Sequence, residues 1–143
     1  MQMWVFGYGS LLWNPGFDYV EKRLARLSGY RRNFCMRSIH HRGTPAMPGL
    51  VLALDAANAA ICDGLAFRIA PEDETQVLAY LRDRELVSSA YYEKTVRLDL
   101  PEVGQLEALA YVIDQTNDQY CQGLSLEEQA RIIATARGGR GDN

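Results

Sequence analysis

Short apolar runs that end at turn-forming residues are the feature that most constrains the fold of this chain. Residues 50–54 and 61–69 are two such runs, and a small polar turn between them predicts a hairpin. Residues 95–100 alternate apolar and polar side chains, residues 106–113 form another apolar run, and residues 101–105 predict the turn of a second hairpin. Strands joined in this way pair antiparallel.

Helical periodicity is confined to a few segments. Proline and acidic residues at 71–74 predict a helix start, and apolar spacing from Val77 continues this helix to about Leu86. A capping box at Ser125 predicts a last helix. Residues 20–36 fit either period, and a Ser-Gly break with aromatic residues after it favours a strand. The pattern indicates an α+β fold with a mainly antiparallel, barrel-like sheet.

Composition narrows the class of protein and of partner. The chain has 143 residues, 48% of them hydrophobic, and 23% charged, as expected for one globular domain over residues 1–143. Its 15 Lys and Arg against 18 Asp and Glu give a net charge of −3, which argues against nucleic acid or an anionic membrane as partner. We therefore expect a small-molecule or protein partner.

Targeting and metal signals are weak. No apolar stretch approaches the roughly 20 residues of a membrane span, and no signal-peptide pattern opens the chain, so we expect a cytoplasmic protein. Cys35, Cys62 and Cys121 are odd in number and far apart, which favours reduced, inert thiols. The adjacent His40 and His41 lack further ligands at suitable spacing, so we expect no metal.

The loop after the first expected strand, residues 3–6, is a candidate binding element. Gly7, Tyr8, Gly9 and Ser10 leave little side-chain bulk over consecutive backbone N–H groups, so the backbone can approach a carboxylate or an oxyanion. A tight turn in which glycines supply positive φ values explains the same residues, and that alternative stays open here.

Glu85 is a candidate proton acceptor. It lies four residues after Leu81 and seven after Leu78, so helical spacing places it on the apolar face with Val77. The last turn of a helix and apolar surroundings both raise a carboxyl pKa, which suits a general base. Pairing with Arg84 or another arginine at the helix end is the structural alternative.

Several ordered motifs of this chain resemble those of the ChaC-type γ-glutamylcyclotransferases, bacterial members above all. The matching segments are residues 4–15, 41–44, 47–49, 80–85, 90–91 and 136–143. The resemblance implies a small β-barrel with flanking helices, no cofactor, and cleavage of glutathione to 5-oxoproline and cysteinylglycine.

The same resemblance assigns site residues by position. Glu85 falls on the catalytic glutamate of the family, and Tyr91 and Tyr120 fall on tyrosines expected to line the pocket. The substrate-binding segment corresponds to Val5, Phe6, Gly7, Tyr8, Gly9, Ser10 and Leu11. Tyr120 follows a polar loop and is the tyrosine we expect to show its hydroxyl to a pocket.

Two departures from the family pattern bear on these expectations. Leu50 stands where the family usually has an arginine, and the sequence ends at Asn143, where related proteins continue into a further helix. We expect either a truncated form or another cover for that surface, such as a second copy of the chain. Two other functions stay open: a cyclotransferase for other γ-glutamyl amines or amino acids, and a non-catalytic domain that binds a γ-glutamyl ligand.

Overall fold

A computed structural model describes residues 2–9, 15–38, 49–86, 91–117, 120, 126–135, 137–138 and 141–142, in places by backbone alone. The strands are β1 (Met3–Gly7), β2 (Glu21–Ser38), β3 (Gly49–Ile69), β4 (Tyr91–Leu100), β5 (Gly104–Ile113), β6 (Arg137–Gly138) and β7 (Gly141–Asp142). The helices are the 3-10 turn η1 (Pro71–Asp73), α2 (Glu74–Glu85) and α3 (Leu126–Thr135). Neither α2 nor α3 has the length and hydropathy to cross a membrane, and the described residues contain no other helix that does.

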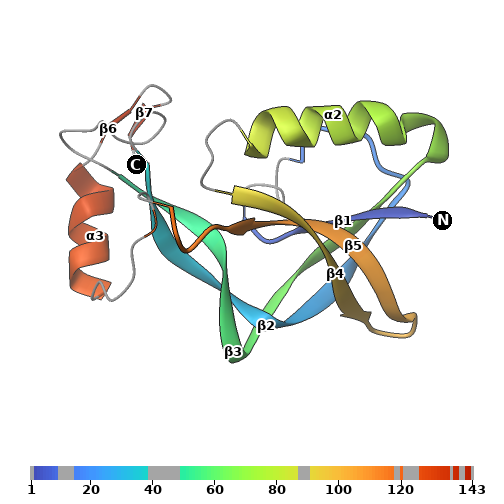
Figure 1. Ribbon diagram of the computed structural model, residues 1–143, viewed down its shortest axis with the longest axis horizontal. Coiled ribbons are helices and arrows are strands. Elements are labelled where there is room, and N and C mark those ends of the chain that lie inside the picture. The colour runs from blue at the N-terminus through green and yellow to red at the C-terminus, as the bar shows by residue number, and fades with distance from the viewer. Residues whose placement is uncertain are drawn as a thin grey trace.

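Five strands close into a barrel in the order β1-β3-β2-β4-β5 (Figure 1). Four of the five pairings are antiparallel, and β1 runs parallel to β5, with Val5 beside Leu109. The expected α+β class with a mainly antiparallel barrel and flanking helices is therefore confirmed. The predicted hairpin around residues 101–105 is also confirmed, because β4 and β5 pair from Leu100 and Gly104 to Tyr91 and Ile113.

The predicted hairpin between residues 50–54 and 61–69 is wrong. Both runs belong to one long strand, β3, which pairs with β2 over most of its length. The pairing passes from Ser28 beside Ile61 to Tyr30 beside Ala56, so the intervening residues of β3 form a bulge. The polar turn signal marks this bulge: β2, itself correctly predicted as a strand, supplies a partner on both sides of it.

Two apolar clusters lie on opposite faces of the barrel wall. The larger fills the interior and contains Trp4, Phe6, Tyr8, Ala25, Leu27, Leu54, Cys62, Ala66, Val96, Leu98, Leu100, Ala108, Ala110 and Val112. The second lies between the wall and α2 and contains Val5, Phe67, Ile69, Val77, Leu81 and Tyr111. Successive residues of β1 serve different clusters, as side-chain alternation in a strand requires.

Helix α2 is fixed along the side of the barrel by these apolar contacts and by an ion pair at its last turns (Figure 1). The Arg82 guanidinium contacts both carboxylate oxygens of Glu93 on β4, each at 3.1 Å. The buried Tyr111 on β5 donates its hydroxyl proton to Glu93 Oε1 at 2.8 Å. One carboxylate therefore ties the end of α2 to two strands.

A turn after β1 is fastened to the same helix. Arg84 Nη1 donates to the Pro15 carbonyl oxygen at 2.9 Å and contacts the Tyr80 hydroxyl at 3.2 Å. Gly16 has a φ of +76°, and a Cβ there would run into that hydroxyl. Glycine is needed at this position both for backbone conformation and for close approach to α2.

Glu93→Gln should reduce stability at neutral pH and flatten its acid decline. The charge-assisted bonds from Arg82 hold the pKa of Glu93 below its usual value, against the opposing effect of burial, and the Tyr111 hydroxyl adds to the lowering. Because the folded pKa lies below the unfolded one, this stabilisation is complete above the unfolded pKa and is lost as pH falls through the folded value. We expect a loss of about 1 kcal/mol at pH 7.

Urea unfolding of the wild type and the variant between pH 3 and pH 7 measures this difference. The two free energies of unfolding should converge toward low pH. Glu72→Gln, at an exposed position before α2, is the control and should follow the wild type. A Glu93→Gln variant that stays equally below the wild type at every pH would contradict the assignment.

Candidate functional site

One end of the barrel brings together most of the described candidate residues. Since β1 and β5 are parallel with Val5 beside Leu109, the residues after β1 and those at the end of β5 lie toward the same end. Tyr91 opens β4 directly opposite Ile113 at the end of β5. The last turn of α2 points toward this end as well (Figure 1). The strand directions therefore place segments far apart in sequence around one site.

Some residues at the end of β1 have side chains in the apolar core, and those that follow Gly7 form the turn. Val5 packs beneath α2 and Phe6 packs inside the barrel, so both side chains are core residues that fix the strand. Tyr8 is also buried, and its hydroxyl donates to the Tyr111 carbonyl oxygen at 3.3 Å. The chain leaves the sheet after Gly7, one residue later than the sequence predicts. Ser10 and Leu11 lie outside the described residues.

Gly9 does not need glycine for its backbone conformation. Its φ lies outside the left-handed region, and a Cβ built there would make only an ordinary contact, 3.9 Å from Leu52 Cδ2 on β3. This weakens, for Gly9, the interpretation of the loop as a turn whose glycines supply positive φ values. A requirement for close approach by another molecule remains a sufficient reason for glycine at this position.

Glu85 is the last residue of α2, at the helix end that the sequence predicts, and its side chain lies outside the described residues. The two nearest arginines each have a partner in the fold. Arg82 contacts Glu93, and Arg84 contacts Pro15 and Tyr80. The last turn of α2, which carries Glu85, is thus anchored by the two arginines that precede it.

Tyr91 and Tyr120 pack against the same small cluster, although 29 positions separate them in the sequence. Both are partly buried and pack against a small cluster formed by Ala53 of β3 and Ile113 of β5. Ala53 follows Leu52, the residue that borders Gly9. The two tyrosines and the Gly9 turn therefore border consecutive residues of β3, whose side chains point to opposite faces of the strand.

Asp55 lies beside the candidate tyrosines, and the sequence analysis did not single it out. Among the described residues it is the one charged side chain that is buried, with 1% of its surface exposed. Gln115 Nε2 donates to its Oδ1 at 2.7 Å, and the Tyr120 hydroxyl donates to its Oδ2 at 3.1 Å. Arg31 Nη2 lies 3.7 Å from Oδ2. In the sequence, Asp55 follows an apolar run and is indistinguishable from an ordinary turn residue.

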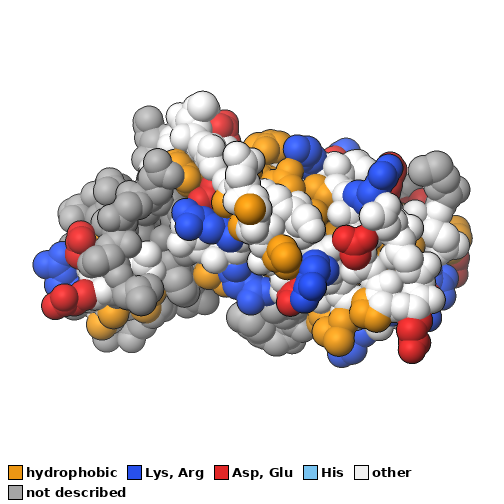
Figure 2. Space-filling view, turned by 90° about the horizontal axis from the view of Figure 1, so that it is seen from below, with side chains coloured by type: hydrophobic (Ala, Val, Ile, Leu, Met, Phe, Trp, Pro, Cys, Tyr) orange, Lys and Arg blue, Asp and Glu red, His pale blue; other side chains and the backbone are white. Residues whose placement is uncertain are grey.

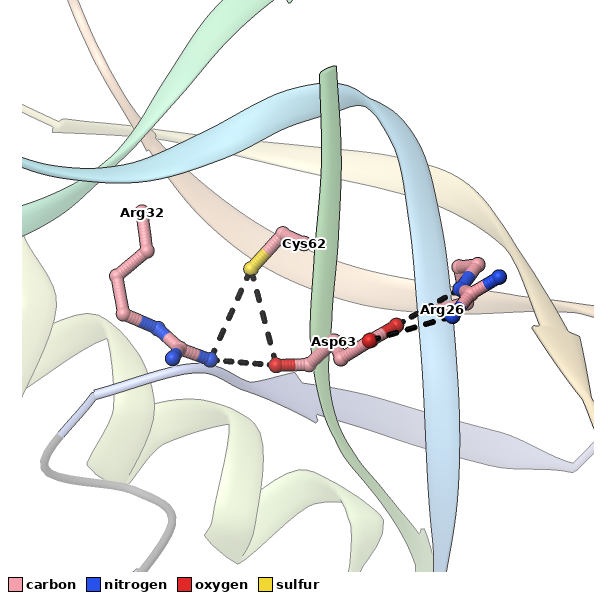
Figure 3. Close-up of polar contacts among 4 residues, drawn as sticks. All are labelled: Arg26, Arg32, Cys62 and Asp63. Carbon is pink, nitrogen blue, oxygen red and sulfur yellow. Dashed lines mark hydrogen bonds and ion pairs between the residues drawn. The ribbon is translucent and has the colours of Figure 1, made fainter.

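Two cavities lie elsewhere on the molecule. One, of about 330 Å³, lies between the Gly16 turn and the start of α2, and the other, of about 710 Å³, lies over β2, β3 and the β4–β5 turn. None of the described residues lining them is among the site residues that the sequence predicts. The larger cavity is bordered by Arg26, Arg32 and Asp63, which are close together in Figure 3.

In the polar cluster beside the larger cavity, both arginines contact residues of the same cluster. Arg26 contacts both carboxylate oxygens of Asp63, at 2.9 and 3.3 Å, and Arg32 donates to the Asp63 carbonyl oxygen and to Cys62 Sγ (Figure 3). Burial raises the pKa of the Cys62 thiol, against the opposing effect of Arg32. Cys62 is buried and forms no disulfide with a described residue, while the side chains of Cys35 and Cys121 lie outside the described residues.

The described surface shows neither a broad patch of one charge on the face in Figure 2 nor a group of metal ligands. On the barrel face shown in Figure 2, basic and acidic side chains are interspersed, and neither sign forms a broad patch. Within the described ranges, no three His, Cys, Asp or Glu side chains are grouped as metal ligands would be. His40 and His41 lie outside those ranges.

Comparison with known proteins gives close relatives over the whole chain. The chain is 40% identical to γ-glutamylcyclotransferase 2-1 of Arabidopsis thaliana and 34% identical to the glutathione-specific γ-glutamylcyclotransferase of Escherichia coli. These alignments cover 100% and 99% of this chain, which spans 69% and 60% of the two relatives.

The fold has a close counterpart among solved structures. A glutathione-specific γ-glutamylcyclotransferase from yeast superimposes with a TM-score of 0.86 at 24% identity, covering 99% of this chain and 81% of that one. The predicted γ-glutamylcyclotransferase-like fold is thereby confirmed. Residues 3–143 match the family described as ChaC-like proteins. With this match and relatives of 34 to 40% identity, the chain belongs to the ChaC-like family.

Proposed function

We propose that this chain is a γ-glutamylcyclotransferase that cleaves glutathione to 5-oxoproline and cysteinylglycine. Membership of the ChaC-like family, with a relative named for action on glutathione, is the observation that carries the proposal. The geometry supports it, because the Gly9 turn, the end of α2 and two tyrosines lie toward one end of the barrel.

The reaction needs no external nucleophile. The α-amine of the γ-glutamyl group attacks its own γ-carbonyl carbon and closes a five-membered ring, and the bond from that carbon to the cysteinyl nitrogen then breaks. The substrate α-ammonium must first lose a proton, and the leaving nitrogen must gain one. The enzyme therefore has to hold one molecule in a folded geometry and move protons within it.

Glu85 is the proposed group for both proton transfers. It stands at the C-terminal end of α2, where the helix dipole disfavours a negative charge and makes a carboxylate a stronger proton acceptor. The contacts of Arg82 with Glu93 and of Arg84 with Pro15 hold this end of the helix in place. A base on a fixed helix end can serve first as acceptor and then as donor to the leaving nitrogen.

The Gly7 to Leu11 segment is the proposed binding element for the negative end of the substrate. Backbone N–H groups after β1 can hold the α-carboxylate or the oxyanion that forms on the γ-carbonyl oxygen. Buried Val5, Phe6 and Tyr8 anchor the strand from which this segment extends. Tyr91 and Tyr120 are proposed to line the pocket opposite it.

Glu85→Gln should abolish most turnover while leaving the fold intact. Loss of a general base costs about two to four orders of magnitude in kcat, and glutamine keeps the size of the side chain. The measurement is 5-oxoproline formation from glutathione, with thermal unfolding to verify the fold. Glu74→Gln, at the first turn of the same helix, is the matched control and should be nearly silent. A Glu85→Gln enzyme with a tenth or more of wild-type activity would refute the role.

Gly9→Ala and Gly29→Ala should have opposite effects. A Cβ fits at Gly9, so Gly9→Ala should fold normally but lower kcat/KM at least tenfold, because it hinders backbone approach to the substrate. Gly29 has a φ of +87°, and no described atom lies within 4 Å of its Cβ position, so Gly29→Ala should lose about 1 kcal/mol of stability and keep its activity. Full activity in Gly9→Ala would reduce the loop to a structural turn.

The reaction should require a free α-amine on the substrate and should tolerate changes in the leaving group better. Glutathione acetylated on the glutamyl nitrogen has lost its internal nucleophile and should not react. Parallel assays with glutathione and γ-glutamyl-alanine compare leaving groups, and we expect glutathione to have the higher kcat/KM. Equal or better use of the dipeptide would replace glutathione with a wider class of γ-glutamyl amines and leave the cyclisation chemistry unchanged.

A further inference from the structure

Asp55 is buried in the barrel wall beside the proposed site, although burial of a carboxylate costs desolvation free energy. A buried carboxylate must be compensated by hydrogen bonds or opposite charge, since it has lost its hydration. Here Gln115, Tyr120 and Arg31 all contact it. Gln115 Nε2 also donates to the Ala56 carbonyl oxygen at 3.2 Å, which fixes the amide in one orientation.

Asp55 lies on β3 two residues after Ala53, the residue against which both candidate tyrosines pack. Side chains alternate along the strand, so Asp55 lies on the same face as Ala53, which packs against Tyr91 and Tyr120. Leu54 points the other way, into the barrel interior. The carboxylate therefore lies behind Tyr120, on the tyrosine face of the wall.

The contact with Asp55 determines the hydrogen-bonding polarity of Tyr120. A phenolic hydroxyl has one proton, and this one is donated to the Asp55 carboxylate, with oxygen-to-oxygen distances of 3.1 and 3.3 Å. Toward any other group the same oxygen can act only as an acceptor. A carboxylate ligand offers no proton to such an oxygen, whereas an ammonium group offers three.

We propose that Asp55 is a positioning residue that fixes the Tyr120 hydroxyl as an acceptor for the substrate α-ammonium. This rests on the proposed function and deepens it, because it assigns the positive end of the γ-glutamyl group to Tyr120. The negative charge of Asp55, relayed through a polarised hydroxyl, favours a cation at this place. The α-amine is the attacking group, so holding its nitrogen also sets the geometry of ring closure.

A double-mutant cycle measures whether Asp55 acts through Tyr120. Asp55→Asn preserves shape but reorganises the hydrogen bond, and we expect kcat/KM for glutathione to fall about tenfold. Tyr120→Phe should fall by a similar factor, and the double variant should be no worse than either single variant. Asp63→Asn is the matched control: it lies on the same strand, contacts an arginine, is exposed, and should keep wild-type activity.

A ligand without the α-amine separates positioning from general structural support. Glutaryl-cysteinylglycine is glutathione without the amino group, so it cannot cyclise and acts as an inhibitor. Its inhibition constant should change less than twofold in Asp55→Asn, because the lost contact is to the amine. Tyr120→Phe leaves the contacts of Asp55 with Gln115 and Arg31 in place. Its kcat/KM for glutathione should fall while its inhibition constant for the glutaryl ligand stays within twofold, so this variant replaces Asp55→Asn if that variant folds poorly.

The outcomes distinguish this proposal from the proposed function. A wild-type protein that forms no 5-oxoproline from glutathione would overturn both. An active wild type whose Asp55→Asn and Tyr120→Phe variants stay within twofold of it would overturn the positioning role alone. Additive losses in the double variant, or weaker inhibition by the glutaryl ligand in proportion to the lost kcat/KM, would show that Asp55 is structural and would also overturn it.

Discussion

The packing of α2 against the barrel is the interaction on which the rest of the arrangement depends. Val77 and Leu81 are buried against Val5, Phe67 and Ile69 of the first and third strands. These apolar contacts supply most of the attraction between helix and sheet but little directional information. Because the contacting residues recur along both β1 and α2, the helix is aligned with the strands whose ends form the proposed site.

Polar contacts then fix the end of the helix in a way that apolar packing alone does not. Glu93 accepts bonds from Arg82 and Tyr111, so the last turns of α2, β4 and β5 share one carboxylate. Arg84 holds the Pro15 carbonyl and thereby the turn that follows the Gly9 region. Arg84, next to the base proposed at Glu85, therefore links the end of α2 to Pro15, in the segment that follows β1.

The site itself combines two kinds of support. Around Gly9 the fold offers backbone with room for a ligand, while around Tyr120 it offers a side chain whose polarity is set by the buried Asp55. Such a division suits a substrate with a carboxylate and an ammonium on the same carbon, because N–H donors suit the first and a polarised oxygen acceptor suits the second.

Local pattern determined the element types correctly where periodicity was strong. The alternation in residues 95–100, the acidic start of α2 and the glycine break after β1 all correspond to the observed elements. The same approach failed at residues 55–60, because a polar break in an apolar run marks either a turn or a bulge. Only the presence of β2 as a partner on both sides of the break decides between them.

The sequence by itself determined the type of the strongly periodic elements, the family and the candidate residues Glu85, Gly9, Tyr91 and Tyr120, because these depend on local spacing and ordered motifs. The tertiary structure alone decided which of these residues lie toward the same end of the barrel. Barrel closure with β1 parallel to β5 brings the start of β4 and the turn after β1 to one end. It also buries Asp55 under Tyr120, a contact across 65 residues that no local pattern encodes, since burial and pairing are properties of the assembled sheet.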